Sequence, residues 1–496
     1  IPLIVRISFI LFFTPHIQFN WFIPFITNFI NKFGTDPWSS FLQSGGSDLA
    51  FPYGIGMLSA YFPLSAFGFL LDRVFGSSFF VFIGFKLTSL IFDYIILLTL
   101  ALLAKQYSNL HLLIVYWCSP LIIYITYIHG QLDIIPIALL FLCISTLQWK
   151  RYAISGCLLA FAISSKFSML VAFPLLLIYI YKTNQFNGNT FRFLKYFLIF
   201  TVILNLPILF SAGFITMVLE TKEIERLYKV YISYGDNLKL YIIPVVYILC
   251  LYQVWKLKIV TKDLFIIATG ISFFALLIFV PPQPGWMLWA VPFLCFYQIR
   301  SKKDVLVLGL LFNFIALINN TSNQFNNIPI NNYSDFHGSI LYDQLINNFH
   351  LKNILFTFQQ GFSLLLAIRM FNYGIQRNSF YKVSEEPYII SIDGSDSDKS
   401  IELALGIEKL LGREKIKYEK MSNFTEMING PYLMQSNKHQ ITEDNYIKNL
   451  EFINERTNIY LTKNRKSNNI LRSIMLILND LIGIKDKPWY VILIND

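Results

Sequence analysis

Apolar runs of 14 to 28 residues, separated by short polar breaks, fill the chain from its start to about residue 380. A helix needs about 20 apolar residues to cross the hydrocarbon core of a bilayer. Charged residues make up about 25% of an average soluble domain, but here Asp, Glu, Lys and Arg supply 14%, and hydrophobic residues supply 55%. This pattern predicts an integral membrane protein and excludes a soluble or a disordered chain.

We expect about twelve membrane spans, several of them short enough to indicate broken or tilted helices. They are 1–14, 77–104, 110–128, 131–148, 152–165, 167–182, 194–212, 239–255, 263–281, 285–299, 304–319 and 353–372. The segment 49–72 is also apolar, but its Pro and Gly content and its polar neighbours favour a helix in the membrane interface. Because the first residue is Ile1 and not Met, we expect the N-terminus to be incomplete. The sequence therefore gives no basis for deciding whether a signal peptide precedes it.

The distribution of Lys and Arg decides the orientation, because these residues collect in cytoplasmic loops. If 49–72 does not cross, the basic residues near 105, 150, 182, 256, 300 and 377 all fall on one side, which is predicted to be cytoplasmic. A crossing 49–72 would invert every later loop. The net charge of +10 therefore does not imply a nucleic-acid partner. The long loops predicted to lie outside are 15–76, 213–238 and 320–352.

The composition changes near residue 380, where ordinary soluble charge density begins. We interpret 1–380 as a transmembrane domain and 384–496 as a small cytoplasmic α/β domain, with the chain stopping inside it. The predicted elements of this domain are a buried strand at 388–392, a helix from about 399 and a last strand in the terminal WYVILIND.

The start of the small domain resembles the phosphate-binding loop of P-loop kinases of the uridine-kinase type. Gly394, Lys399 and Ser400 would be its nucleotide-binding residues. The loop needs a glycine before the lysine so that backbone N–H groups can surround phosphate, and Asp398 stands there instead. We therefore expect a degenerate loop that does not bind ATP well, with an unrelated α/β domain as the alternative.

Unusual polar residues of the membrane domain fall on the predicted outer side. They are Asp36, Asp48, Gln131, Asp133, Lys166, Gln283 and Trp286. Ionisable groups at membrane depth are costly and usually face a polar cavity, so we predict an outward-facing site. All five cysteines lie in apolar segments, which predicts neither a disulfide framework nor a cysteine metal site.

Each of these residues also has a purely structural interpretation. Asp36 and Asp133 could cap helices, and Trp286 and Trp289 are typical of an interfacial aromatic belt. Lys166 lies on the side that the charge rule depletes, which favours an anionic partner such as a lipid phosphate. Within the span 77–104, Lys86 and Asp93 are seven residues apart on one helical face, which suggests a buried ion pair between them.

Four motifs occur in order: G-x-D-P-W and F-P-Y-G before residue 55, Ser-Pro with G-Q-x-D at 119–133, a small-residue helix ending in Lys166, and P-G-W-x-L-W-x-x-P at 284–292. This order resembles the GT-C glycosyltransferases, in particular the bacterial mannosyltransferase-like branch. The resemblance covers about residues 1–300. It implies a bacterial inner-membrane enzyme that transfers a sugar from a polyprenyl phosphate to an acceptor on the outer face.

In that family an acidic residue of the first outer loop acts as the base, and a basic residue, sometimes with Mg²⁺ or Mn²⁺, binds the lipid phosphate. The acidic pair of the family falls here on Gln18 and Asn20, which are amides. The resemblance therefore assigns Asn20 to substrate binding and leaves Asp36 or Asp48 as the catalytic base. The alternative is a transporter or flippase of lipid-linked saccharides, which would use the same cavity without catalysis.

Overall fold

The computed structural model describes most of the helical region and four strands of the C-terminal region. The described ranges are 2–104, 109–184, 188–208, 210–221, 225–235, 237–257, 260–280, 283–301, 303–322, 349–380, 388–394, 419–421, 432–437 and 489–495. The chain divides into two compact units, Ile1–Leu257 with Lys262–Gly374 and Lys258–Thr261 with Ile375–Asp496.

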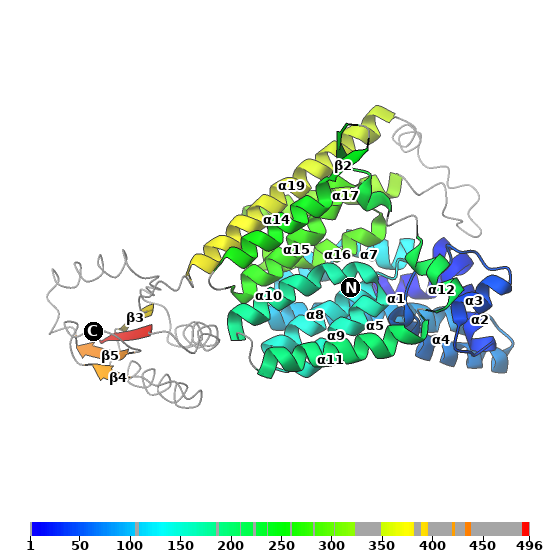
Figure 1. Cartoon of the computed structure of the whole chain (residues 1–496), viewed down its shortest axis with the longest axis horizontal. Coiled ribbons are helices and arrows are strands. Elements are labelled where there is room, and N and C mark those ends of the chain that lie inside the picture. Colours follow the sequence, from blue (N-terminus) through cyan, green and yellow to red (C-terminus); the bar gives the residue numbers. More distant parts are fainter. Residues whose placement is uncertain are drawn as a thin grey trace. The chain divides into compact units, whose positions relative to one another are not determined.

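The first unit is a bundle of helices that lie side by side (Figure 1). Its helices are α1 (Pro2–Phe12), α2 (Ile23–Asn31), α3 (Pro37–Gln43), α4 (Ile55–Phe75), α5 (Phe80–Leu103), α6 (Asn109–Leu112), α7 (Pro120–Ile123), α8 (Ile134–Gln148), α9 (Tyr152–Ser165), α10 (Ala172–Asn184), α11 (Gly188–Asn205), α12 (Ala212–Phe214), α14 (Ile242–Lys256), α15 (Lys262–Phe279), α16 (Pro284–Arg300), α17 (Lys303–Ser322) and α19 (Phe349–Phe380). Short π-helical and 3₁₀ turns connect several of them: η1 (Gln18–Phe22), η2 (Leu113–Trp117), η3 (Tyr124–His129), η4 (Phe167–Val171), η5 (Leu206–Ile208), η6 (Ile215–Leu219) and η7 (Arg226–Tyr228).

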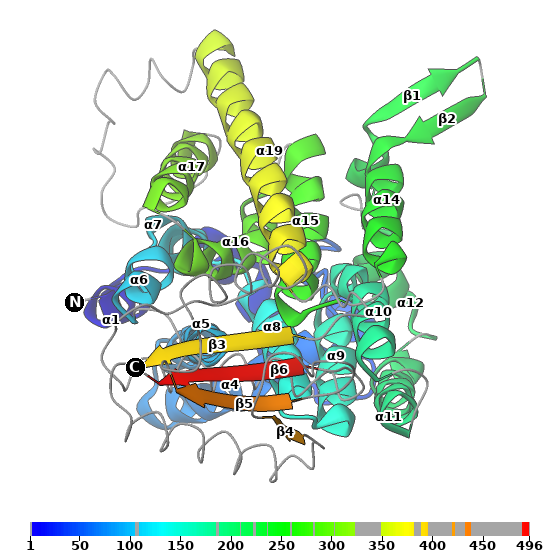
Figure 2. The ribbon, with the colours of Figure 1, turned by 90° about the vertical axis from the view of Figure 1, so that its left-hand side faces the viewer.

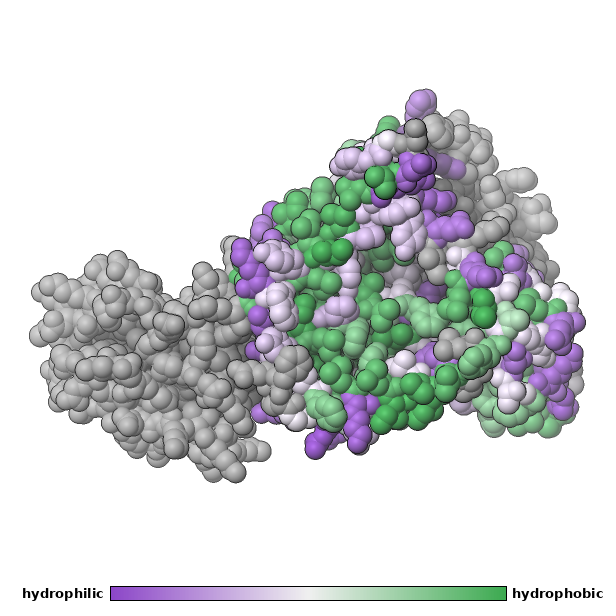
Figure 3. Space-filling view, in the orientation of Figure 1, coloured by the Kyte–Doolittle hydropathy of each residue, from purple (hydrophilic) through white to green (hydrophobic). Residues whose placement is uncertain are grey.

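Among the described helices, five are long and apolar enough to cross a membrane by length and composition. They are Ile55–Phe75, Phe80–Leu103, Lys262–Phe279, Asp304–Thr321 and His350–Ile375. A bent pair, Leu110–Trp117 and Pro120–His129, counts as a sixth if it is one span. Each of the twelve predicted spans contains a helix, and hydrophobic residues cover the middle of the bundle between more hydrophilic ends (Figure 3). The predicted fold class, a polytopic helical membrane protein, is confirmed.

The helix is interrupted within the predicted span 110–128. Its two halves meet at 42°, and Ser119 caps α7 by accepting a hydrogen bond from the N–H of Ile122. Pro120 follows at the first position of α7. Proline lacks an N–H and clashes with the preceding turn, so it is tolerated at a helix start but breaks a helix interior. The Ser-Pro pair therefore starts a new helix at this point.

Helices α4 and α5 form an antiparallel hairpin. The ring of Tyr61 stacks on Phe85 at 4.1 Å, and the Tyr61 hydroxyl is 2.7 Å from Ser89 Oγ. Farther along α4, Gly68 packs against the backbone of Phe80. α4 thus runs beside the first half of α5. The interfacial position of 49–72 stays a prediction, and the helix itself begins at Ile55.

The described part of the second unit is a four-stranded parallel sheet. Its strands are β3 (Tyr388–Gly394), β4 (Glu419–Met421), β5 (Tyr432–Asn437) and β6 (Trp489–Asn495), in the order β3-β6-β5-β4. Figure 2 shows β3, β6 and β5 side by side. Both predicted strands are confirmed and are paired with each other. Parallel neighbouring strands require crossover connections, which agrees with the predicted α/β domain. The predicted helix from 399 lies outside the described residues.

Candidate functional site

Asp133 and Lys166 meet where two helices of the bundle end. Asp133 precedes α8 and is 1% exposed, whereas Lys166 follows α9 with 13% of its side chain exposed. Lys166 Nζ is 3.8 Å from Asp133 Oδ1, which is an ionic contact too long for a hydrogen bond. The indole N–H of Trp289, on α16, donates a hydrogen bond of 3.0 Å to the same oxygen. Three helix ends thus converge on one carboxylate.

Tyr53, from the loop before α4, closes this cluster. Its hydroxyl is 3.4 Å from Asp133 Oδ2 and 3.3 Å from Gln131 Oε1. Lys166 Nζ lies 4.3 Å from the centre of the Tyr53 ring, a cation–π distance. Sequence reasoning included Tyr53 in the F-P-Y-G motif but gave it no role. The motif was the signal that could have found it.

Two glycines explain how these segments approach so closely. A Cβ on Gly54 would lie 2.1 Å from the carbonyl oxygen of Ser164, next to the end of α9. A Cβ on Gly285 would lie 2.3 Å from Asp133 Oδ2. The loop that carries Tyr53 and the start of α16 can therefore reach the cluster only with glycine at these positions.

The side chain of Asp133 does not cap α8: no hydrogen bond runs from it to the first turn of that helix. Its carboxylate contacts Trp289, Tyr53 and Lys166 instead. Trp286 and Trp289 are each 4% exposed and stack at 5.5 Å. The interpretation of these tryptophans as an interfacial belt is wrong, because a belt residue exposes its ring to the lipid headgroups.

Gln283 occupies the N-cap position of α16, where its side chain makes no capping hydrogen bond, and it faces Arg226 on η7 instead. With its amide oxygen turned toward Arg226, Gln283 accepts hydrogen bonds from the guanidinium, including one of 2.9 Å from Nη2. Sequence reasoning missed Arg226. It lies on the predicted outer side, as Lys166 does, but its loop also carries Lys229 and Lys239, so it does not stand out.

Asp36 is a helix N-cap, as the structural interpretation proposed. Its Oδ1 accepts hydrogen bonds from the N–H of Ser39 at 3.1 Å and from the hydroxyl of Ser211 at 2.6 Å. Partial burial raises the pKa of the Asp36 carboxyl, but the hydrogen bonds from Ser211 and Ser39 outweigh it and hold the pKa below its ordinary value. A carboxylate with a lowered pKa is a weaker base.

The remaining predicted residues of the first outer loop are spread out. Asp48 and Asn20 are exposed. Gln18 is 1% exposed, and its amide donates a hydrogen bond of 3.0 Å to the carbonyl oxygen of Gly130. Gln18 therefore joins the end of the first span to the G-Q-x-D turn.

The expected ion pair between Lys86 and Asp93 is wrong. Asp93 pairs with Arg6 of α1 at 2.7 Å, and Lys86 donates hydrogen bonds to the carbonyl oxygens of Ile10 and Phe13. The partner of Asp93 lies on the first helix, and the partners of Lys86 lie at the end of that helix. Unpaired carbonyl groups at a helix end attract a cation such as Lys86. Helical spacing alone could not identify a partner on another helix.

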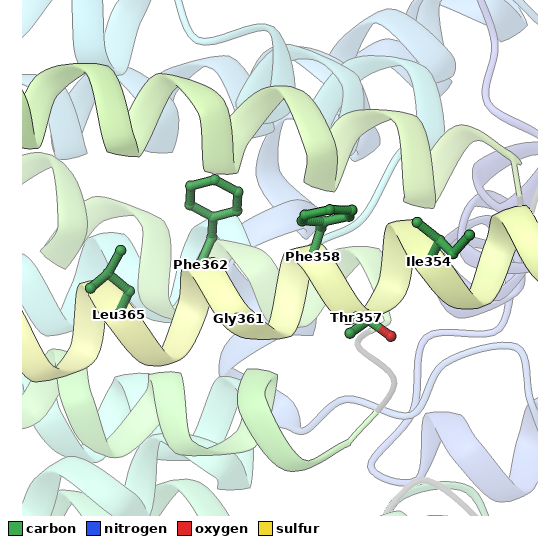
Figure 4. Close-up of a pocket in the computed structure, with 6 residues that line it drawn as sticks. All are labelled: Ile354, Thr357, Phe358, Gly361, Phe362 and Leu365. Carbon is green, nitrogen blue, oxygen red and sulfur yellow. The ribbon is translucent and has the colours of Figure 1, made fainter.

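The predicted nucleotide-binding residues belong to the second unit. Gly394 ends β3, while Lys399 and Ser400 lie outside the described residues. A pocket of about 390 Å³ is lined by residues of α19, and Figure 4 shows these residues along the helix. Within the described ranges, no three His, Cys, Asp or Glu side chains are grouped to hold a metal ion.

No protein-family model matches the sequence, and a search of the curated proteins finds no match. Among solved structures, the fold is similar to the crystal structure of ArnT from Cupriavidus metallidurans bound to undecaprenyl phosphate. The identity is 10%, the TM-score is 0.38, and the alignment covers 79% of this chain and 82% of that chain.

Proposed function

We propose that this protein is a membrane glycosyltransferase of the GT-C type. It moves a sugar, with mannose as the first candidate, from a polyprenyl phosphate to an acceptor on the outer face of a bacterial inner membrane. The observation that carries the proposal is the cluster of Lys166, Asp133, Gln131 and Tyr53 at converging helix ends. The sequence motifs support it, because F-P-Y-G, G-Q-x-D, the small-residue helix ending in Lys166 and P-G-W-x-L-W-x-x-P each contribute a residue to this cluster.

Lys166 is the proposed phosphate ligand. Its ammonium is partly exposed, 3.8 Å from Asp133 and 4.3 Å from the centre of the Tyr53 ring, so a phosphate can approach it from the exposed side. A charge-assisted hydrogen bond to phosphate is strong in a partly desolvated site. Gln131, Gln283 and Trp286 would then contact the sugar, and Arg226 adds a second cation near Gln283.

A base must accept the proton of the acceptor hydroxyl while the bond from the anomeric carbon to the phosphate oxygen breaks. Asp36 and Asp48 are the proposed candidates. Asp36 caps α3 and has a lowered pKa, whereas Asp48 is exposed. Because the carboxylate of Asp36 is already bonded to Ser39 and Ser211, Asp48 is the first candidate for the base. Asp133 is engaged with Lys166, and we assign it to positioning.

One observation favours the second candidate, a flippase or transporter of lipid-linked saccharides. Within the part of the chain that the structure describes, the carboxylate beside Lys166 is Asp133 and neither proposed base. A site that binds the lipid phosphate without a base beside it would suit transport.

Purified protein in proteoliposomes distinguishes the two functions. A set of radiolabelled polyprenyl-phosphate sugars is added with a range of acceptors. A transferase moves the label to a water-soluble or lipid acceptor and releases polyprenyl phosphate. A transporter moves the intact labelled lipid between leaflets. Lipid movement without cleavage for every sugar tested would overturn the transferase proposal.

A further inference from the structure

A β-hairpin extends from the start of α14. It consists of β1 (Tyr231–Tyr234) and β2 (Leu238–Tyr241), which pair antiparallel. All the described residues of the hairpin are exposed except the half-buried Tyr241, where β2 leads into α14. Figure 2 shows the hairpin projecting from the N-terminal end of α14, away from the other helices. Two isolated strands are marginally stable in water, so an additional contact is expected to support them.

The two faces of the hairpin differ in character, because side chains alternate along a strand. The register pairs Ile232 with Leu240 and Tyr234 with Leu238 on one face. The exposed fractions of these four side chains are 50%, 37%, 60% and 70% in that order. We call this set the apolar face.

The opposite face is polar and aromatic. The register pairs Tyr231 with Tyr241 and Ser233 with Lys239 there. Lys239 Nζ lies 4.5 Å from the centre of the Tyr231 ring, so the charge is held on this side of the hairpin. The hairpin is therefore amphipathic across its thickness.

The apolar face continues into a lipid-exposed helix. Tyr241 of β2 is followed directly by Ile242 of α14. Along α14, the side chains of Ile248, Leu249, Tyr252 and Trp255 are 61%, 54%, 57% and 49% exposed. Positions i, i+1, i+4 and i+7 lie on one side of a helix. In a membrane protein such a side faces lipid, so the hairpin begins at the outer end of a lipid-facing helix.

We propose that the apolar face of the hairpin inserts into the outer leaflet of the bilayer at headgroup depth. Tyrosine favours this depth, because its ring is apolar and its hydroxyl is polar. The open edges of a two-stranded hairpin carry unpaired backbone groups, which cannot enter the hydrocarbon core. Headgroup depth satisfies both conditions, with Ser233 and Lys239 turned toward the headgroups and water.

Insertion of the hairpin would also fix the position of Arg226 next to the candidate site. The ring of Tyr228, at the end of η7, contacts the ring of Tyr241 at 5.0 Å. η7 carries Arg226, which faces Gln283. The inserted hairpin would hold this cation at the membrane surface, whether the site transfers a sugar or only binds a lipid. The inference does not depend on the proposed reaction.

Spin labels on neighbouring residues test the insertion. Single cysteines replace Tyr234 and Leu238 on the apolar face, and Ser233 and Lys239 on the opposite face, in a background without native cysteines. Each variant is labelled with a nitroxide and reconstituted in liposomes of bacterial phospholipids. Power-saturation measurements then compare collisions with oxygen, which concentrates in lipid, and with a water-soluble nickel chelate.

We expect labels at 234 and 238 to favour oxygen over the nickel chelate several-fold more than their neighbours at 233 and 239. Equal ratios within both pairs would overturn the proposal, because the hairpin would then be solvated on both faces. Low access to both reagents at 234 and 238 would overturn it as well and would indicate a protein partner. Because all four positions are exposed, the labels should not disturb folding.

Discussion

Arg6 on α1 and Asp93 on α5 form an ion pair in which both side chains are 0% exposed, with 2.7 Å between Nε and Oδ2. Tyr116 and Tyr127 each donate a hydrogen bond of 2.8 Å to the carboxylate of Asp93. The guanidinium lies 3.8 Å from the centre of the Trp117 ring. These contacts tie the first helix to both helices of the bent pair, whose C-terminal end at His129 leads to the candidate site.

Replacing Arg6 with Met should destabilise the protein by about 3–5 kcal/mol, because it leaves a buried carboxylate without its counter-ion. The double variant Arg6→Met/Asp93→Asn should recover much of that loss, since it removes the uncompensated charge and keeps an oxygen for the tyrosines. Thermal unfolding in detergent micelles measures both effects.

The ion pair between Arg369 and Asp304 provides the matched control. Its side chains are 39% and 56% exposed, with 2.6 Å between Nη1 and Oδ2. Arg369→Met should destabilise the protein much less than Arg6→Met, because exposed pairs are solvated and screened. Equal losses for Arg6→Met and Arg369→Met would show that the buried charge is not what stabilises the bundle.

Variants of Asp36 separate its capping role from a catalytic one. Asp36→Asn keeps an oxygen that can accept the N–H of Ser39, whereas Asp36→Ala removes it and should cost about 1 kcal/mol. If Asp36 only caps α3, Asp36→Asn retains transfer activity and Asp48→Asn loses it. Loss of activity in Asp36→Asn, with an unchanged melting temperature, would instead make Asp36 the base. Activity and thermal unfolding of the three variants are the measurements.

The lowered pKa of Asp36 also predicts how stability changes with pH. A carboxyl whose pKa is lower in the folded state stabilises that state above its unfolded pKa, and the contribution disappears as the pH falls through the folded value. The difference between native protein and Asp36→Asn should therefore be constant from neutral pH to about pH 5 and shrink below about pH 4. A difference that changes between pH 6 and 8 would assign the effect to another group.

Most of the helices could be predicted, because each membrane span is identified from the hydrophobicity of its own residues. The twelve segments each contain a helix, and the Ser-Pro break at 119–120 is where α7 begins. The contacts between spans could not be predicted in the same way. Asp93 has Lys86 on its own helix, but its partner is Arg6, 87 residues away in the chain. Helical spacing carries no information about a neighbouring helix.

The candidate site was predicted in part for the same reason. Charge asymmetry singled out Lys166, and the G-Q-x-D motif supplied Asp133, which contacts it. Tyr53 and the burial of Trp289 depend on close packing at Gly54 and Gly285, which appears only when the segments are placed together. A sequence shows that a glycine is present, but not which atom would collide with a side chain there.

The predicted topology can be tested with two cysteines at exposed positions. Ser47 lies in the first outer loop and Arg151 in a loop predicted to be cytoplasmic; both are exposed. In a background without native cysteines, an impermeant maleimide added to spheroplasts should label Ser47→Cys and not Arg151→Cys. Permeabilised cells should label both, which controls for reactivity. Labelling of Arg151→Cys alone in sealed spheroplasts would invert the orientation and place the candidate site in the cytoplasm.

Lys166→Met tests the proposed phosphate ligand most directly. The substitution keeps an apolar stem but removes the ammonium, and donor binding should weaken by about 1.5–3 kcal/mol if that ammonium meets a phosphate. Lys182→Met is the matched control, because Lys182 also makes a cation–π contact, 4.8 Å from the centre of the Trp255 ring, but near the other end of the bundle. Donor affinity is measured by titrating a polyprenyl phosphate in nanodiscs.

Asp133 determines how the stability of Lys166→Met should be interpreted. Its side chain is 2% exposed and loses the nearby charge of Lys166 when that residue is replaced. Some destabilisation is therefore expected, although Trp289 and Tyr53 still donate hydrogen bonds to the carboxylate. Lys166→Met/Asp133→Asn should restore stability without restoring donor affinity. If the double variant regains both, Lys166 acts only by neutralising Asp133, and the phosphate must be held elsewhere.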